Sequence, residues 1–89
     1  MRSRGTAKFW ALFAALPADV QKSARDKYRL FRSDPRHGSL QFKQIHATRQ
    51  IYSVRIGLGY RAVGVMSEGT IIWFWAGSHR DYERLIRGL

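Results

Sequence analysis

The sequence predicts an α+β fold in which two N-terminal helices pack on a four-stranded, mainly antiparallel curved sheet, followed by a short C-terminal helix. Apolar residues recur with a helical period in the first third of the chain, and with a strand-like period after His37-Gly38. Short glycine-containing turns separate the later strands, as in an antiparallel meander. The length of 89 residues suits one domain with one core, so residues 1–89 are expected to form a single domain.

Two helices are expected before the first strand. Thr6 can cap the first helix, which runs to about Leu16. Its apolar residues share the i, i+3, i+4, i+7 spacing of one helical face: Phe9, Leu12, Phe13 and Leu16. Pro17 suits the first turn of the second helix, because it has no N–H to leave unpaired. That helix runs to about Arg32, and Asp34-Pro35 ends it because proline disfavours a helical residue before it.

The N-terminal stretch also has an alternative interpretation. A basic start, Met1 to Lys8, precedes the apolar run from Phe9 to Leu16, which superficially resembles a secretory signal. The helical spacing of the apolar residues, and the missing small-x-small pattern around Pro17-Ala18, favour an amphipathic helix instead. Met1 to Gly5 is expected to be a frayed start.

Four strands and a last helix are expected after His37-Gly38. The strands are Leu40 to Ile45, Ile51 to Ile56, Tyr60 to Met66 and Thr70 to Ala76. In the second of them, Ser53 and Arg55 face the side opposite to Tyr52, Val54 and Ile56. Asp81 to Leu89 is predicted to be the short final helix. Because both long helices cover one face of the sheet, the other face is expected to stay partly open for function.

Charge narrows the choice of partners. Sixteen Lys and Arg residues against six Asp and Glu residues give a net charge of +10 and favour polyanionic partners. Nucleic acid and an acidic protein both qualify. An anionic membrane surface fits less well, since no apolar run approaches the roughly 20 residues needed to span a membrane. The absence of cysteine indicates a reducing compartment, so we expect a cytoplasmic protein.

The same residues argue against metal-dependent chemistry, and no metal or cofactor is expected. The three histidines lie far apart, without ligand spacing. The carboxylates are few and scattered, and none pairs into a two-metal site or an acid/base dyad. These observations count against metal nucleases and glycosidases.

Several local strings, taken in order, resemble the RelE/ParE superfamily of toxins from type II toxin–antitoxin pairs. The strings are Leu16-Pro17, Asp34-Pro35, Ser39 to Lys43, Tyr52 to Gly57, Gly59 to Ala62, Trp73 to His79 and Asp81-Tyr82. They cover the chain from about Phe9 to Ile86, and the last strand with its following turn resembles the family most strongly. Their order and spacing make the superfamily assignment specific, whereas the branch within it stays open.

The resemblance implies a function as well as a fold. RelE-like members cleave messenger RNA, usually in the ribosomal A site, without a metal, whereas ParE-like members poison DNA gyrase. Both are neutralised by a partner protein that wraps the toxin. The favoured hypothesis is therefore a metal-independent endoribonuclease that acts on mRNA at the ribosome and is held in check by a cognate acidic antitoxin in a hetero-oligomer. The alternatives are a ParE-like gyrase poison and a degenerate member that only binds its antitoxin.

Candidate catalytic residues lie on the later strands and beyond them. Arg61 matches the strand-three arginine that RelE-like nucleases use on the phosphate, and Arg55 stands where they carry a lysine. His79 lies close to their catalytic arginine or histidine, and imidazole can act as acid or base near neutrality. Tyr82 could orient His79 or stack on a base, and Lys43 could face the substrate. Each also has a structural interpretation: a solvated arginine, a capping histidine, or a tyrosine that anchors the last helix.

A further basic stripe follows the second helix, beside Lys22. Its members are candidates for binding RNA phosphates or an acidic antitoxin, or form a solvated face: Arg25, Arg29 and Arg32. The three tryptophans are assigned to the core or to surface that the antitoxin covers, with base stacking as the alternative. The chain departs from the RelE pattern at its end, because Ile86 to Leu89 holds neither an aromatic residue nor a histidine. The catalytic set is therefore a histidine-centred variant or incomplete.

Overall fold

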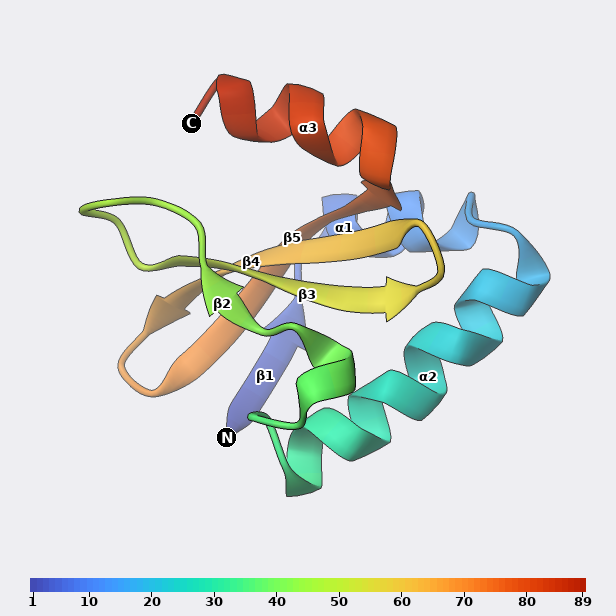
Figure 1. The fold of residues 1–89 in the computed structure, drawn as a ribbon, viewed down its shortest axis with the longest axis horizontal. Coiled ribbons are helices and arrows are strands. Elements are labelled where there is room, and N and C mark those ends of the chain that lie inside the picture. The colour runs from blue at the N-terminus through green and yellow to red at the C-terminus, as the bar shows by residue number, and fades with distance from the viewer.

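The computed structural model describes residues 1–89 and shows a five-stranded mixed sheet with helices on both faces (Figure 1). The strands are β1 (Arg2–Gly5), β2 (Lys43–Gln44), β3 (Ile51–Gly57), β4 (Tyr60–Ser67) and β5 (Thr70–Ser78). The helices are α1 (Ala7–Ala14), α2 (Ala18–Ser33) and α3 (His79–Arg87), with a 3₁₀ turn at Gly38–Leu40. The spatial order of the strands is β1-β5-β4-β3-β2. None of the helices is long and apolar enough to cross a membrane.

The N-terminal segment corrects one expectation. Residues 1–5 were expected to fray, but Arg2–Gly5 forms β1 and pairs in parallel with β5, from Arg2 opposite Thr70 to Gly5 opposite Trp73. The sheet therefore has five strands rather than four. Backbone hydrogen bonds explain this strand, because pairing covers the N–H and C=O groups that β5 would otherwise expose at the sheet edge.

The predicted strand from Leu40 to Ile45 is also corrected. Leu40 ends the 3₁₀ turn, and Gln41 adopts the left-handed conformation with φ 47° and ψ 42°, so only Lys43–Gln44 pairs with β3. The apolar pattern came from burial rather than from strand pairing, since the side chain of Leu40 is fully buried.

The helices form where the spacing predicted them, with small shifts at their ends. Phe9 and Phe13 form the buried side of α1, and the Thr6 hydroxyl accepts a hydrogen bond from the Phe9 N–H (3.1 Å). Pro17 is the residue before α2 rather than its first helical residue. The last helix, α3, begins at His79, two residues earlier than expected, because the Ser78 hydroxyl caps it by accepting from the N–H of Asp81 (3.2 Å).

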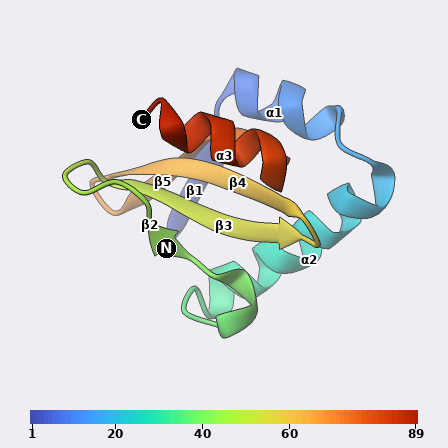
Figure 2. The same cartoon turned by 45° about the horizontal axis from the view of Figure 1, so that its top comes forward.

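The two faces of the sheet carry different layers (Figure 2). One face packs on α1 and α2 around an aromatic and aliphatic core that includes Phe31, Val54 and Trp73. On the other face, α3 covers a smaller cluster of Ile51, Val63 and Tyr82. The predicted alternation along β3 is confirmed, so Ser53 and Arg55 lie on the α3 face. Since α3 crosses only part of this face, the polar residues beside it stay close to the surface.

Gly64 allows a close approach at the centre of the sheet. A β-bulge lies between Val63 and Gly64 opposite β5. A methyl group at Gly64 would lie 2.8 Å from the Trp73 ring, 2.9 Å from Ile71 and 3.0 Å from the Ile72 carbonyl oxygen. The last of these atoms belongs to the backbone and cannot easily move.

We therefore expect Gly64→Ala to destabilise the protein by about 1–3 kcal/mol through overpacking. For a domain of this size, each kcal/mol lowers the melting temperature by roughly 4–8 °C, which thermal unfolding measures. Gly38→Ala is the control, because nothing lies within 4 Å of the added methyl group. Equal melting temperatures for the two variants would contradict the packing argument.

Candidate anion-binding site

Arg61 is the centre of the polar residues on the α3 face. It lies on β4, opposite Arg55 on β3 and opposite Gly77 on β5. Only 6% of the residue is exposed, whereas arginine side chains in proteins are mostly exposed. The neighbouring elements supply every group that contacts it.

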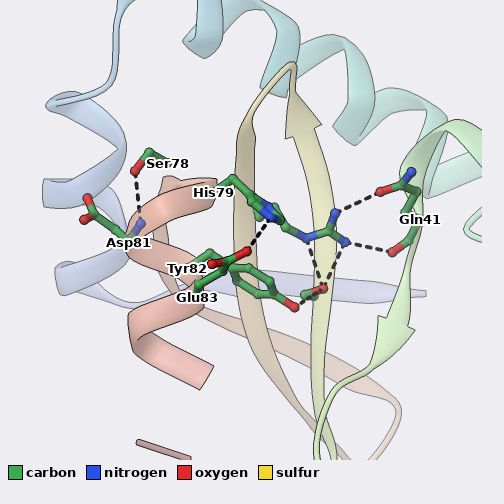
Figure 3. Close-up of polar contacts among 8 residues, drawn as sticks. Gln41, Ser78, His79, Asp81, Tyr82 and Glu83 are labelled. Atoms are coloured by element: carbon green, nitrogen blue, oxygen red, sulfur yellow. Dashed lines mark hydrogen bonds and ion pairs between the residues drawn. The ribbon is translucent and has the colours of Figure 1, made fainter. Parts of the chain in front are cut away.

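Four hydrogen bonds hold the guanidinium (Figure 3). Nε and Nη2 donate to Ser53 Oγ at 3.3 and 3.0 Å. Nη1 donates to Gln41 Oε1 at 2.9 Å, and Nη2 donates to the Gln41 carbonyl oxygen at 3.0 Å. A guanidinium has five N–H groups, so a single N–H on Nη1 remains free.

Tyr82 joins this cluster to α3. Its ring lies 5.3 Å from Arg61 Cζ, within the range of a cation–π contact. Its hydroxyl donates to Ser53 Oγ at 3.3 Å, and only 6% of the residue is exposed. Tyr82 therefore anchors the last helix to the sheet, as its structural interpretation predicted, and also forms one wall of the site.

The charge of Arg61 has no counter-ion. Its hydrogen-bond acceptors, Ser53 and Gln41, are both neutral, and none of the ion pairs in the structure includes it. Burial lowers the pKa of Arg61 below its usual value; Tyr82 raises this pKa and the nearby charge of Arg55 lowers it. Buried charges in proteins are normally paired, because desolvation is costly. The site is thus a positive centre that an anion would stabilise.

His79 lies at the rim of the site, at the first position of α3. Its backbone N–H donates to the Gly59 carbonyl oxygen at 2.7 Å, which ties the helix to the β3–β4 turn. Nε2 lies 3.1 Å from Glu83 Oε1, and the imidazole ring lies 5.7 Å from the Tyr82 ring. The side chain of His79 is 56% exposed, so a ligand in solvent can reach it. A carboxylate on Nε2 leaves Nδ1 as the other nitrogen able to exchange a proton.

The structure brings most of the predicted catalytic residues to one face. Arg55 is half-buried beside Arg61 and belongs to no ion pair. Lys43 on β2 pairs in register with Ser53, so this exposed cation borders the same face. Arg61 contacts Tyr82, and Tyr82 contacts His79, which gives a continuous row from the sheet to the rim.

The basic stripe on α2 lies away from Arg61 and the other predicted catalytic residues. Its residues line a groove of about 430 Å³ on the opposite side of the sheet, between β1, α1 and α2. Arg25 lies over the Phe13 ring at 5.5 Å, and Arg29 pairs with Asp26 at 2.8 Å. Arg32 also lines the groove. The expectation that these three arginines bind the same substrate as Arg61 therefore has no support in their positions.

Three residues of the site were missed as functional residues. Ser53 was placed on the correct face, and a lone hydroxyl among apolar residues in a buried strand was the available signal. Gln41 gave no such signal, because its role depends on the left-handed turn that follows the 3₁₀ segment. Glu83 was likewise not identified, although its i, i+4 spacing from His79 on a helix allows the pair.

Comparisons with known proteins identify the fold. The family model described as a ParE-like toxin domain matches residues 18–84. A chain of the RelB–RelE antitoxin–toxin complex from Methanococcus jannaschii superposes with a TM-score of 0.71 at 17% identity, covering 91% of this chain and 95% of that one. The isolated RelE toxin of E. coli gives 0.66 at 15% identity, with 99% and 98% covered. The YoeB/ParE toxin from Agrobacterium tumefaciens gives 0.67 at 18%, with 89% and 99% covered. No curated protein sequence matches.

Because Arg61 has no carboxylate partner, we expect its removal to change the stability of the protein little. Arg61→Met removes four hydrogen bonds but also removes a buried, unpaired charge, and Ser53 keeps its bond from Tyr82. We expect its melting temperature to change by less than roughly 8 °C in either direction, which is about 1 kcal/mol. Tyr82→Ala is the comparison, since loss of a buried aromatic ring costs about 3–5 kcal/mol. A larger loss of stability for Arg61→Met than for Tyr82→Ala would show that the arginine is mainly structural.

Proposed function

Because the chain belongs to the ParE-like toxin family, we propose that it is the toxin of a type II toxin–antitoxin system and that it cleaves messenger RNA without a metal. The buried guanidinium of Arg61, which has no carboxylate partner, is the observation that carries this proposal. Such a centre favours a bound phosphate, and RNA is the polyanion in which a phosphate also reacts with its own neighbouring hydroxyl group.

The cleavage chemistry assigns a role to each side chain. The 2′-hydroxyl loses its proton as its oxygen attacks the adjacent phosphorus, and negative charge grows on the phosphate oxygens. The bond from phosphorus to the 5′-oxygen breaks, which leaves a 2′,3′-cyclic phosphate and a 5′-oxygen that takes up a proton. Arg61 and Arg55 would stabilise that charge. His79 would transfer a proton at the rim, with Glu83 orienting its imidazole. Tyr82 holds the arginine and the histidine on either side of its ring. Lys43 would bind a neighbouring phosphate.

The ribosome is the expected place of action. A net charge of +10 gives the protein a long-range attraction to ribosomal and messenger RNA. Each phosphate that a lysine or arginine neutralises releases counter-ions, so this attraction weakens steeply as salt increases.

Poisoning of DNA gyrase is the second candidate function. The matched family model is described as a ParE-like toxin domain, and Arg55 stands where RelE-like nucleases carry a lysine. In that case the same surface would bind protein, and Arg61 would meet a carboxylate of the partner instead of a phosphate.

An acidic antitoxin is the expected protein partner. The groove between α1 and α2 has an apolar floor with exposed Trp10 and Tyr28, and its rim carries basic side chains. Its basic residues are Arg4, Arg25, Lys27, Arg29 and Arg32. An acidic segment with apolar residues on one side complements both the floor and the rim. We propose that the antitoxin segment binds here, on the face opposite Arg61.

The proposed activity is tested in cells that express the chain without its partner. Mapping RNA 5′ ends and measuring plasmid supercoiling in the same culture distinguishes the two candidate functions. We expect new RNA ends with unchanged supercoiling. Arg61→Met and His79→Ala should each reduce cleavage by about 10²-fold or more and relieve growth arrest. Lys22→Met is the control, because this exposed residue on α2 lies outside the site.

The opposite outcome is equally specific. Altered supercoiling without new RNA ends would replace the nuclease with a gyrase poison. Full cleavage by both Arg61→Met and His79→Ala would discard the site itself.

The partner proposal is tested with the small acidic protein that we expect the neighbouring reading frame to encode. Trp10→Ser should weaken the complex by about 30-fold or more, as loss of a central tryptophan does at protein interfaces. Leu58→Ser is the matched control, because Leu58 is 86% exposed but lies in the β3–β4 turn outside the groove. Calorimetric titration at fixed salt measures both affinities. An equal loss of affinity in the two variants would remove the groove as the binding surface.

A further inference from the structure

Gln41 meets Arg61 in the manner of a bound anion. Its two oxygens accept from two different nitrogens of the guanidinium, Oε1 from Nη1 at 2.9 Å and the carbonyl oxygen from Nη2 at 3.0 Å. This two-pronged arrangement on the end of the guanidinium is the one that arginine forms with carboxylates and phosphates. The other edge of the guanidinium is occupied by Ser53.

The two partners of Arg61 differ in how firmly they are held. Ser53 is fully buried in the middle of β3 and accepts from Tyr82 as well. Gln41 is exposed and belongs to no strand. Its backbone adopts φ 47° and ψ 42°, a left-handed conformation that residues with a Cβ rarely adopt. Gln41 is therefore the partner that an incoming ligand can displace.

We propose that Gln41 occupies the oxyanion subsite of this centre as a neutral stand-in, and that a phosphate must displace it to reach Arg61. The identity of the anion as an RNA phosphate rests on the proposed function, whereas the subsite itself rests on the four hydrogen bonds of Arg61. Only one N–H of the guanidinium is free while Gln41 is in place, which is too few for a bidentate phosphate.

Displacement is favourable because of charge. A phosphate replaces two neutral oxygens by charged ones, so both partners of each hydrogen bond are then ionised and Coulomb attraction adds to the bond. It also gives the buried guanidinium its missing counter-ion. Gln41 thus stays hydrogen-bonded to Arg61 until an anion displaces it.

This role predicts a gain in affinity when the side chain is removed. Gln41→Gly frees Nη1 and makes the left-handed backbone unstrained in either state. A residue that merely positioned Arg61 would give a loss instead. Gln41→Glu places a carboxylate beside the guanidinium, and this ion pair should exclude phosphate from Arg61.

The test measures anion binding by calorimetric titration, using inorganic phosphate and a short single-stranded RNA blocked by 2′-O-methyl groups. We expect Gln41→Gly to bind both probes about three- to tenfold more tightly, the effect of removing one competing hydrogen bond. Gln41→Glu should bind at least about tenfold more weakly. Unchanged or weaker binding by Gln41→Gly would overturn the proposal.

Two matched controls test whether a change of a left-handed residue to glycine, or an added negative charge, alters anion affinity by itself. Glu68→Gly changes the other residue with a left-handed backbone and a side chain (φ 49°), in the β4–β5 turn at the opposite end of β4. Gln50→Glu makes the same change of charge as Gln41→Glu at an exposed residue before β3, where a carboxylate can still accept from Tyr52. Neither control should shift either affinity by more than about twofold, since exposed single charges act weakly.

Cleavage of unblocked RNA by the unchanged protein, the same variants and Arg61→Met distinguishes this proposal from the proposed function. If no variant cleaves RNA but phosphate binding follows the expected order, the nuclease function is wrong and the subsite stands. If cleavage depends on Arg61 while Gln41→Gly leaves both affinities unchanged, the nuclease function stands and the subsite proposal is wrong.

Discussion

The guanidinium of Arg61, buried without a carboxylate partner, brings four separate segments of the chain together. β4 carries the guanidinium, β3 supplies Ser53, the 3₁₀ turn supplies Gln41 and α3 supplies Tyr82. Segments separated by up to 41 residues in sequence, from Gln41 to Tyr82, therefore meet at one side chain. Burial of an ion costs several kcal/mol unless it is paired, and this sequence places no carboxylate there. An arrangement that sacrifices stability at one point is typical of a binding or catalytic site.

The two faces of the sheet bury different kinds of side chain. The helical hairpin of α1 and α2 buries the large aromatic and aliphatic side chains on one face. The smaller α3 covers only part of the other face and leaves the polar row from Arg61 to His79 accessible at one end. Because Gly64 beside the β-bulge has no side chain, the Trp73 ring can pack directly against β4.

The parts of the fold that the sequence could predict are those with a clear period. The helical spacing of Phe9 and Phe13, and the alternation along β3, gave the correct faces. The first strand could not be predicted, because Arg-Ser-Arg-Gly has no apolar pattern and pairs only when β5 lies beside it. The same reasoning explains which residues of the site could be predicted from the sequence. Arg55 and Arg61 flank the short turn between the expected strands Ile51 to Ile56 and Tyr60 to Met66, so a hairpin brings them together. The role of Gln41 depends on backbone geometry that no local pattern encodes.

NMR of the arginine Nε–Hε groups during titration with inorganic phosphate measures whether Arg61 binds an oxyanion. If the buried guanidinium is such a site, the Arg61 signal should shift along a saturating curve, and Arg61→Met should abolish the saturable component of binding. Arg61 is not an oxyanion site if phosphate shifts exposed arginines such as Arg84 and Arg87 without saturation while the Arg61 signal stays in place.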